Sequence, residues 1–430
     1  MNRKARRKRK RIRLLSLSLI IIVGILAATF VVNGMGKNQH NVGDNPINEE
    51  PDPGEVVNVP DYEEPEEPED KPNVNVNIKA TGDIMFHPSQ LDGAYDPATG
   101  SYDFHNSFKA VKEIFSSADL AIANFEGTTA GNDAYDFQGY PLFNAPDEVL
   151  DAIKDAGFDV LSTVNNHSLD TRKAGVIRTI QQIKERGMDP IGTYIEKPET
   201  RVLIKDVKGI KLAFLSYTEM VNGLESVLSP TDLDAMINII NEKKILEDIA
   251  YAKSKNADII IACMHWGDEY ARVQAERQEV LADWLFSEGV DIILGSHPHV
   301  IQPAQKLEYD GKTKFVAYSM GNFLSNQRIE TLIPYGLSEE VSKYTEDGVI
   351  VDINIEKNGK TGEVTIKDIS YIPLWVYKGM TEDGGTEHVV YPIMKYIESA
   401  ELNENAKIRM QRSLSDTSKQ MQLLESNTVE

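Results

Sequence analysis

The chain has 430 residues, which is long enough for one large domain with accessory segments. Its formal net charge is −22, and because nine basic residues lie between Arg3 and Arg13, the remainder of the chain carries −31. A chain this acidic excludes the binding of nucleic acid or another polyanion by general attraction, so an anionic partner needs bound cations, a local basic pocket or other subunits.

The N-terminal segment predicts a membrane anchor. Residues 1–13 form a basic tail, and residues 14–32 carry no charge over a length that spans about 28 Å as a helix, close to the thickness of a bilayer core. The basic flank favours a cytoplasmic N-terminus, an extracellular main domain and a location in the cell membrane. A cleaved signal peptide is the alternative, because Ala27 and Ala28 are small enough for a peptidase, but the length of the span favours an uncleaved helix.

Residues 33–72 predict a disordered tether. They include an acidic, proline-rich stretch at positions 63–70 and almost no large apolar residue, so they cannot bury enough surface to offset the entropy of ordering. We expect the main domain at residues 73–375. A C-terminal extension, residues 376–430, should hold one or two polar helices that fray into a disordered end.

Five apolar segments predict strands that each deliver a polar side chain at the carboxyl end. They are residues 74–80, 120–123, 160–164, 258–263 and 290–294. The side chains that follow them are those of Asp83, Glu126, Asn166 with His167, His265, and His297 with His299. An α/β sheet builds its site at the carboxyl ends of its strands, and imidazole is the commonest metal ligand among side chains. A single histidine there is more often an ordinary loop residue, but three such histidines favour a metal site.

The remaining pattern alternates strands with helices and then turns to strands alone. Helices are expected at residues 147–157, 171–186, 240–255 and 274–287, and later strands at 314–318, 348–355 and 363–371. This order suits two central sheets flanked by helices. The single cysteine, Cys263, lies in an expected buried strand and excludes an internal disulfide.

The order of the polar residues resembles that of the calcineurin-like metallophosphoesterases. The local motifs are more specific, and over roughly residues 74–371 they resemble the CapA family, which is named for capsule biosynthesis and for poly-γ-glutamate synthesis and export. The motifs that carry this resemblance are Gly82-Asp83-Ile84-Met85, Asn124-Phe125-Glu126, Asn165-Asn166-His167 with Asp170, His265-Trp266-Gly267-Asp268-Glu269-Tyr270, His297-Pro298-His299-Val300-Ile301-Gln302-Pro303 and Ser319-Met320-Gly321-Asn322-Phe323.

The resemblance implies an α/β fold, a calcineurin-like four-layer αββα sandwich, here preceded by one transmembrane helix. It also implies a divalent Mn, Fe or Zn centre with Glu126 as the bridging ligand. One ion would take Glu126, Asn166, His265 and His297; the other would take Asp83, Glu126 and His299. The chain departs from the pattern at Met85, where the wider superfamily has a ligand histidine, and at Arg172, where relatives often carry glycine. The first departure favours one ion over two; the second could alter access to the pocket.

His167 is the expected general acid, and Asp170 is close enough in sequence to orient it. Asp170 could equally cap the helix that follows. Trp266 and Tyr270 either line the pocket or belong to the core.

Two kinds of function fit these features. One is a metal-dependent hydrolase outside the membrane that acts on a phosphoester, on the γ-glutamyl polymer or on an unrelated cell-envelope substrate. The other is a membrane-anchored accessory subunit that works with an anionic polymer such as poly-γ-glutamate and with other membrane subunits of a synthase or exporter.

Overall fold

The structure is a computed structural model that describes residues 71–381 and 384–422. The expected anchor and nearly all of the expected tether lie outside these ranges. Among the residues that are described, no helix has both the length and the apolar character needed to cross a bilayer.

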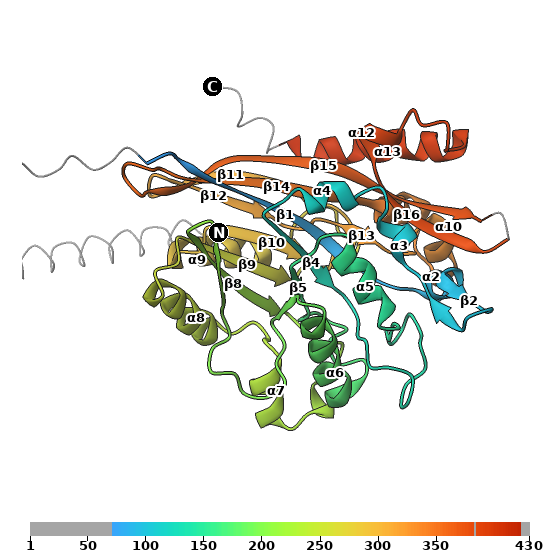
Figure 1. Ribbon diagram of the computed structural model, residues 1–430, viewed down its shortest axis with the longest axis horizontal. Helices are drawn as coiled ribbons and strands as arrows, with labels where there is room; N and C mark the ends of the chain where they lie inside the picture. The colour runs from blue at the N-terminus through green and yellow to red at the C-terminus, as the bar shows by residue number, and fades with distance from the viewer. Residues whose placement is uncertain (1–70, 382–383, 423–430) are drawn as a thin grey trace, which may run out of the picture. The chain divides into compact units, whose positions relative to one another are not determined.

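Two large mixed sheets form the centre of the described domain (Figure 1). The first has the order β16-β15-β14-β1-β4-β5-β6, with β13 paired to the end of β1. Its strands are β1 (Val74–Ile84), β4 (Leu120–Phe125), β5 (Val160–Ser162), β6 (Asp189–Ile191), β13 (Asn322–Leu324), β14 (Asp347–Lys357), β15 (Val364–Met380) and β16 (Thr386–Pro392). The second sheet has the order β11-β12-β10-β9-β8-β7. Its strands are β7 (Leu203–Val207), β8 (Ile210–Thr218), β9 (Ile259–His265), β10 (Ile292–Ser296), β11 (Ala304–Tyr309) and β12 (Lys312–Ala317).

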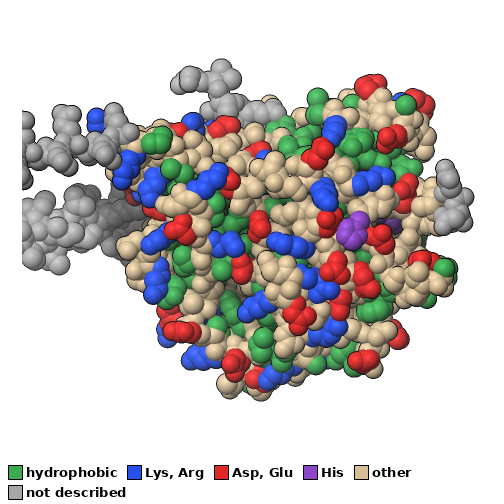
Figure 2. Space-filling model, in the orientation of Figure 1, with side chains coloured by type: hydrophobic (Ala, Val, Ile, Leu, Met, Phe, Trp, Pro, Cys, Tyr) green, Lys and Arg blue, Asp and Glu red, His purple; other side chains and the backbone are tan. Residues whose placement is uncertain are grey.

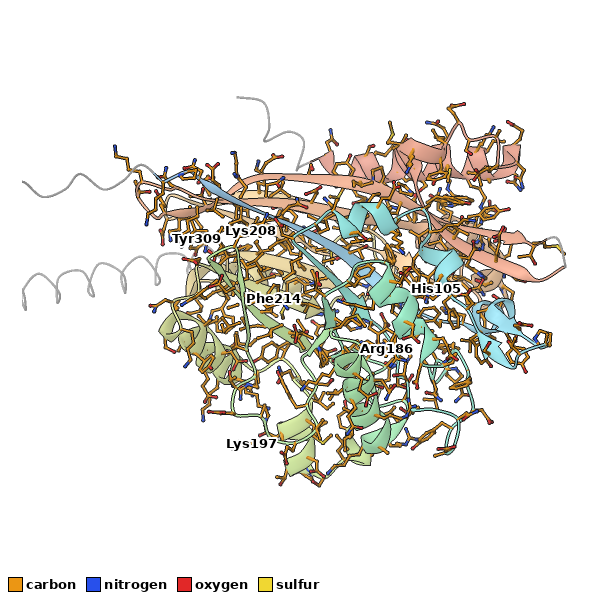
Figure 3. All side chains as sticks on the ribbon, in the orientation of Figure 1. His105, Arg186, Lys197, Lys208, Phe214 and Tyr309 are labelled. Carbon is orange, nitrogen blue, oxygen red and sulfur yellow. The ribbon has the colours of Figure 1, made fainter. Side chains whose placement is uncertain are left out.

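The two sheets pack face to face through one apolar layer. Alternate residues of β1, such as Ile78, meet Phe214 of β8 and Ile261 of β9 in this layer, because side chains of a strand alternate between its two faces. Phe214 is 0% exposed (Figure 3). Both faces of each central strand are therefore buried, which explains the nearly continuous apolar runs in the sequence.

Helices cover the outer face of each sheet. On the first sheet, α4 (Lys112–Ser116) and α5 (Glu148–Asp155) pack their apolar residues against Ala121 and Phe125 of β4. On the second sheet, α8 (Glu242–Ser254) and α9 (Glu276–Glu288) pack against Ile260 of β9. The order helix, sheet, sheet, helix confirms the four-layer α/β sandwich expected from the sequence.

The C-terminal part differs from expectation. Strand β15 continues through residue 375, where the domain was expected to end, and β16 occupies residues expected to be helical. The run Val389-Val390-Tyr391 is rich in residues that favour strands, and it pairs with β15. The helix α13 (Glu404–Gln420) then covers this hairpin, burying Met410 with Trp375 and Tyr391. The hairpin of β15 and β16 thus belongs to the first sheet, and α13 packs on it.

Acidic and basic side chains are interspersed over the face of the domain shown in Figure 2. No broad region of one sign is visible on this face, so the net charge of −22 does not gather into a single acidic surface there. An anionic ligand would have to be recognised by a local group of cations.

We predict that a chain ending at residue 375 loses cooperative folding, whereas a chain of residues 71–422 keeps it. The shorter chain leaves Trp375 without Tyr391 and Met410, and each buried side chain of this size contributes about 1.5–3 kcal/mol. Thermal unfolding followed by circular dichroism measures the difference. A cooperative transition of similar midpoint in both chains would show that the domain does end at residue 375.

Candidate metal centre

Five strands bring the candidate residues to one place, and β5, which precedes Asn166, pairs with β4. The end of β1 pairs with the end of β4, with Asp83 opposite Asn124, and the end of β9 pairs with the end of β10, with His265 opposite Ser296. The backbone is tightly packed here. A Cβ on Gly82 would lie 1.8 Å from the carbonyl oxygen of Gly321, so only glycine allows this approach next to Asp83.

The six predicted ligands come together in two overlapping groups. Ligand atoms of Glu126, His265 and His297 lie within 4.8 Å of one another, and so do those of Asp83, Glu126 and His299. All of these residues are buried. Glu126 belongs to both groups, which is the position that the resemblance gives to the bridging carboxylate.

Asn166 completes the first group. Its Oδ1 lies 3.0 Å from Nε2 of His265, while Nδ1 of His265 lies 2.9 Å from Oγ of Ser296. Ser296 therefore holds the ring so that Nε2 faces Glu126 and Asn166, as the outer neighbours of a metal-bound histidine usually do.

The segment His297-Pro298-His299 bends so that its two imidazoles join different groups. His297 has φ 97° and His299 has φ 58°, both in the left-handed region that favours glycine. Holding non-glycine residues there costs about 1–3 kcal/mol each, and such strain gathers at functional sites. The surrounding fold keeps this strain in place.

Two buried ligand atoms have no hydrogen-bond partner, Oε1 of Glu126 and Nδ1 of His297. Leaving a buried polar atom unpaired costs about 1–3 kcal/mol, and more for a charged group. Both atoms are electron-pair donors within the ligand groups. A divalent cation at this position would satisfy both, so the residues present fit a metal.

The ionisation of the histidines also suits metal binding. Burial and the neighbouring His297 hold the pKa of His265 well below its usual value, and burial and His299 lower that of His297 to about 4. Both imidazoles thus keep a free electron pair at neutral pH. Burial also opposes charging of His299, but Glu126 and Asp83 outweigh it and raise its pKa to about 9. Burial and the nearby Asp83 raise the pKa of Glu126. These shifts follow from the burial of the cluster and from the like and unlike charges that it brings together.

His167 and Asp170 form a pair beside the ligand groups. Nδ1 of His167 lies 2.7 Å from Oδ2 of Asp170, which also accepts a hydrogen bond of 2.6 Å from the backbone nitrogen of Phe143. The helix α6 (Arg172–Glu185) has Thr171 as its N-cap, so Asp170 orients His167 and does not cap the helix.

Of the two aromatic residues considered in the sequence, Trp266 belongs to the core and Tyr270 lies at the site. Trp266 is 0% exposed and packs in the core beneath the second sheet. Tyr270 lies beside the centre, its ring 6.0 Å from that of His299. Arg172 has φ 60°, in the left-handed region that favours glycine.

Three neighbours of the centre have no role in the sequence prediction. Nδ2 of Asn124 donates to Asp83 (2.8 Å) and to Glu126 (3.3 Å), and Ser296 orients His265. Asn124 and Ser296 lie next to predicted ligands, so the motifs held a signal for them. The ring of His87 lies 5.2 Å from that of Phe143, and no motif in the sequence indicated a role for this residue.

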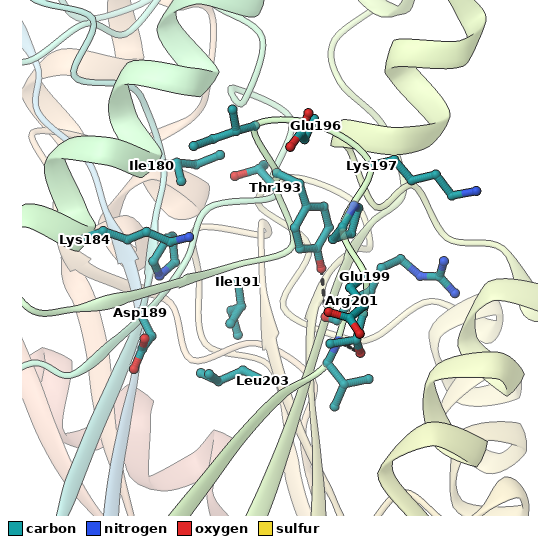
Figure 4. A pocket seen from close by; sticks show the side chains of 16 residues that line it. Ile180, Lys184, Asp189, Ile191, Thr193, Glu196, Lys197, Glu199, Arg201 and Leu203 are labelled. Atoms are coloured by element: carbon teal, nitrogen blue, oxygen red, sulfur yellow. Dashed lines mark hydrogen bonds between the residues drawn. The ribbon is translucent and has the colours of Figure 1, made fainter. Parts of the chain in front are cut away.

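A pocket of about 450 Å³ lies elsewhere, at the edge strands β6 and β7 (Figure 4). Charges of both signs line it, including Lys184, Asp189 and Arg201, and the hydroxyl of Tyr194 donates to the backbone oxygen of Arg201 at 2.8 Å. It shares no residue with the ligand groups, so it adds nothing to the candidate centre.

We predict that a chelator lowers the melting temperature of the wild-type protein and that His297→Ala abolishes this sensitivity. Metal bound to the folded form stabilises it by mass action, by about 2.7 kcal/mol at a free metal concentration of 100 Kd. His105→Ala is the matched control, because His105 is exposed and its ring is bonded to the exposed Asp103, away from both ligand groups. Equal chelator shifts in the wild type and in His297→Ala would contradict the assignment.

The family described as "Bacterial capsule synthesis protein PGA_cap" matches residues 77–327. "Capsule biosynthesis protein CapA" of Bacillus anthracis is 27% identical over 327 residues, which cover 72% of this chain and 74% of that protein. "PGA biosynthesis protein CapA" of Bacillus subtilis (strain 168) is 30% identical over 301 residues, which cover 67% of this chain and 70% of that protein.

Solved structures are similar only at a low level. The calcineurin-like phosphoesterase YfkN from Bacillus subtilis has a TM-score of 0.40 and 16% identity, covering 81% of this chain and 99% of that chain. The NAD nucleotidase NadN of Haemophilus influenzae has a TM-score of 0.43 and 12% identity, covering 81% of this chain and 64% of that chain. Scores of this size carry no weight for function, whereas the family match covers more than half of the sequence. The chain belongs to the bacterial capsule synthesis protein PGA_cap family.

Proposed function

We propose that this protein is a membrane-anchored member of the capsule synthesis family whose extracellular domain carries a divalent-metal centre with hydrolase chemistry. The observation that supports the centre most strongly is the unpaired, buried Oε1 of Glu126, which lies 4.0 Å from Nε2 of His265 and 3.7 Å from Nε2 of His299. We propose an anionic cell-envelope polymer, such as poly-γ-glutamate, as the partner, because the relatives are named for capsule and PGA biosynthesis.

In this proposal the first ion is held by Glu126, Asn166, His265 and His297, and a second, weaker position by Asp83, Glu126 and His299. The oxygen and imidazole donors suit Mn²⁺, Fe²⁺ or Zn²⁺. Such an ion would polarise the bond to be cleaved and lower the pKa of water. Met85 is buried and offers only a weak thioether sulfur, so we favour a single ion.

The chain's own acid in this proposal is His167. Asp170 holds Nδ1, which leaves Nε2 to deliver a proton to the leaving group. Phe143 packs edge-to-face against the ring at 4.7 Å and 82°, and its backbone nitrogen holds Asp170. The imidazole is therefore fixed from two sides.

An accessory role is the second candidate. In that case the same centre binds metal or polymer within a membrane synthase or exporter without turnover. A hydrolase acting on an unrelated cell-envelope substrate is the remaining alternative, since the same metal ligands serve hydrolases of different substrates.

We predict that His167→Ala lowers turnover by about 10²- to 10⁴-fold without loss of metal, because it removes a general acid and no ligand. Hydrolysis of a chromogenic phosphodiester and of poly-γ-glutamate, together with the metal content of each variant, measures this. His297→Ala should lose both metal and turnover. If polymer production in cells depends on His297 but is indifferent to His167, the accessory role is correct.

We also predict that the full chain resists extraction from membranes at alkaline pH with its N-terminus intact. The proposal rests on the basic residues 1–13 followed by the uncharged residues 14–32. Sequencing of the mature N-terminus tests it. A protein that is released into the medium and begins near Thr29 would show that the segment is a cleaved signal peptide.

A further inference from the structure

A group of nitrogen-bearing side chains lies beside the candidate metal centre, around Asn326. We call Asn326, Lys378, His388 and His87 the Asn326 cluster. Oδ1 of Asn326 accepts hydrogen bonds from Nζ of Lys378 at 2.9 Å and from Nε2 of His388 at 3.0 Å. Lys378 and His388 are paired across strands β15 and β16. The backbone nitrogen of Asn326 donates to Nδ1 of His87 at 3.3 Å.

These bonds leave two N–H groups of the cluster without a partner. Because Oδ1 of Asn326 accepts both bonds, the orientation of its amide group is fixed, and Nδ2 is left to donate to another group. No hydrogen bond of Nδ2 is found within residues 71–381 and 384–422, and the nitrogen is not sealed off from solvent. Asn326 is 9% exposed and His87 is 8% exposed.

The tautomer of His87 follows from its neighbours. A proton on Nδ1 would leave the backbone N–H of Asn326 without an acceptor. With Nδ1 as the acceptor, Oε1 of Gln90, 3.2 Å from the same nitrogen, keeps its bond from the backbone N–H of His87. From the bond of Asn326 we assign the proton of the neutral ring to Nε2, where it can donate.

Lys378 supplies a positive charge that forms no salt bridge with a carboxylate of the described residues, although Glu330 acts on it from a distance. Its Nζ bonds only to neutral oxygens, those of Asn326 and, at 3.4 Å, of Ser89, and the described part of the chain gives it no salt bridge. The nearby Arg328 is paired with Glu330 and Glu346. Partial burial and Arg328 lower the pKa of Lys378. A half-buried ammonium without a counter-ion is costly unless an anion joins it.

The cluster adjoins the metal centre on two sides. The ring of His87 meets that of Phe143 at 5.2 Å, and Phe143 meets the acid His167 at 4.7 Å. On the other side Nε2 of Gln327 lies 3.5 Å from the hydroxyl of Tyr270, which stands beside His299. A substrate at the metal would therefore have the Asn326 cluster next to it.

We propose that Lys378, Nδ2 of Asn326 and Nε2 of His87 form an anion-binding subsite that holds a carboxylate or phosphate group of the substrate beside the metal centre. The inference rests on the proposed function in that it takes the substrate to be anionic. His388 has a positioning role, because its bond to Oδ1 keeps the amide of Asn326 turned outward. The adjoining pocket of about 340 Å³ is lined by Asp103 and Glu387, so it does not favour a second anion.

The test is isothermal titration of the full chain with two probes, inorganic phosphate and a γ-linked glutamate trimer. Lys378→Gln should weaken binding about tenfold or more, as expected for a lost charge-assisted hydrogen bond. Lys395→Gln is the matched control, since it removes the same charge from an exposed lysine whose ion pair is with Glu113. Asn326→Asp should also abolish binding, because its new carboxylate would pair with Lys378, and it should not lower the melting temperature.

Titrations of metal-loaded and of chelator-treated protein separate the two proposals. Binding that depends on Lys378 in both preparations supports the subsite even if the protein holds no metal. Binding of one probe alone identifies the anion as carboxylate or phosphate. Equal affinity in the wild type, Lys378→Gln and Asn326→Asp, or binding of neither probe by the wild type, would overturn the inference.

Discussion

The central constraint in this structure is a buried carboxylate with an unpaired oxygen. Oε1 of Glu126 lies between His265 and His299 and has no hydrogen-bond donor, in a part of the fold where both faces of each sheet are covered. Burying an ionised carboxylate is expensive unless opposite charge compensates it. Burial and the nearby Asp83 raise the pKa of Glu126, and, against the effect of burial, Glu126 and Asp83 raise the pKa of His299, so each of these groups depends on the charge of its neighbours. A divalent ion would supply the compensating charge.

The backbone around Glu126 is tightly packed and adopts conformations that are unfavourable in free energy. Gly82 and Gly321 bring β1 and β13 into direct contact behind Asp83, and His297 and His299 adopt a left-handed conformation. The strain becomes reasonable if it serves to aim two imidazoles at adjacent positions. Two charged groups near each other are also unfavourably placed: among the described residues Lys378 has no salt bridge and Oε1 of Glu126 has no hydrogen-bond donor. A metal ion with an anionic substrate bound to it would stabilise both groups.

Much of the fold and of the ligand cluster could be predicted from the sequence. The apolar runs that became β1, β4, β5, β9 and β10 are continuous because these strands are buried on both faces, and the polar residue after each run is where parallel strands end together. The C-terminal hairpin could not be predicted as securely. Whether Val389-Val390-Tyr391 forms helix or strand is decided by the free edge that β15 offers. The Asn326 cluster also lacked a local signal, since Asn326 and His87 are 239 positions apart in the chain.

The account depends most directly on a cation between the two ligand groups. An anomalous-scattering map of crystals grown with Mn²⁺ or Zn²⁺, recorded at the absorption edge of the metal, would locate it. We predict a peak about 2.0–2.2 Å from Oε1 of Glu126 and from a ring nitrogen of His265 and of His297. A map without a peak there, with Oε1 of Glu126 hydrogen-bonded to protein or water instead, would contradict the metal centre.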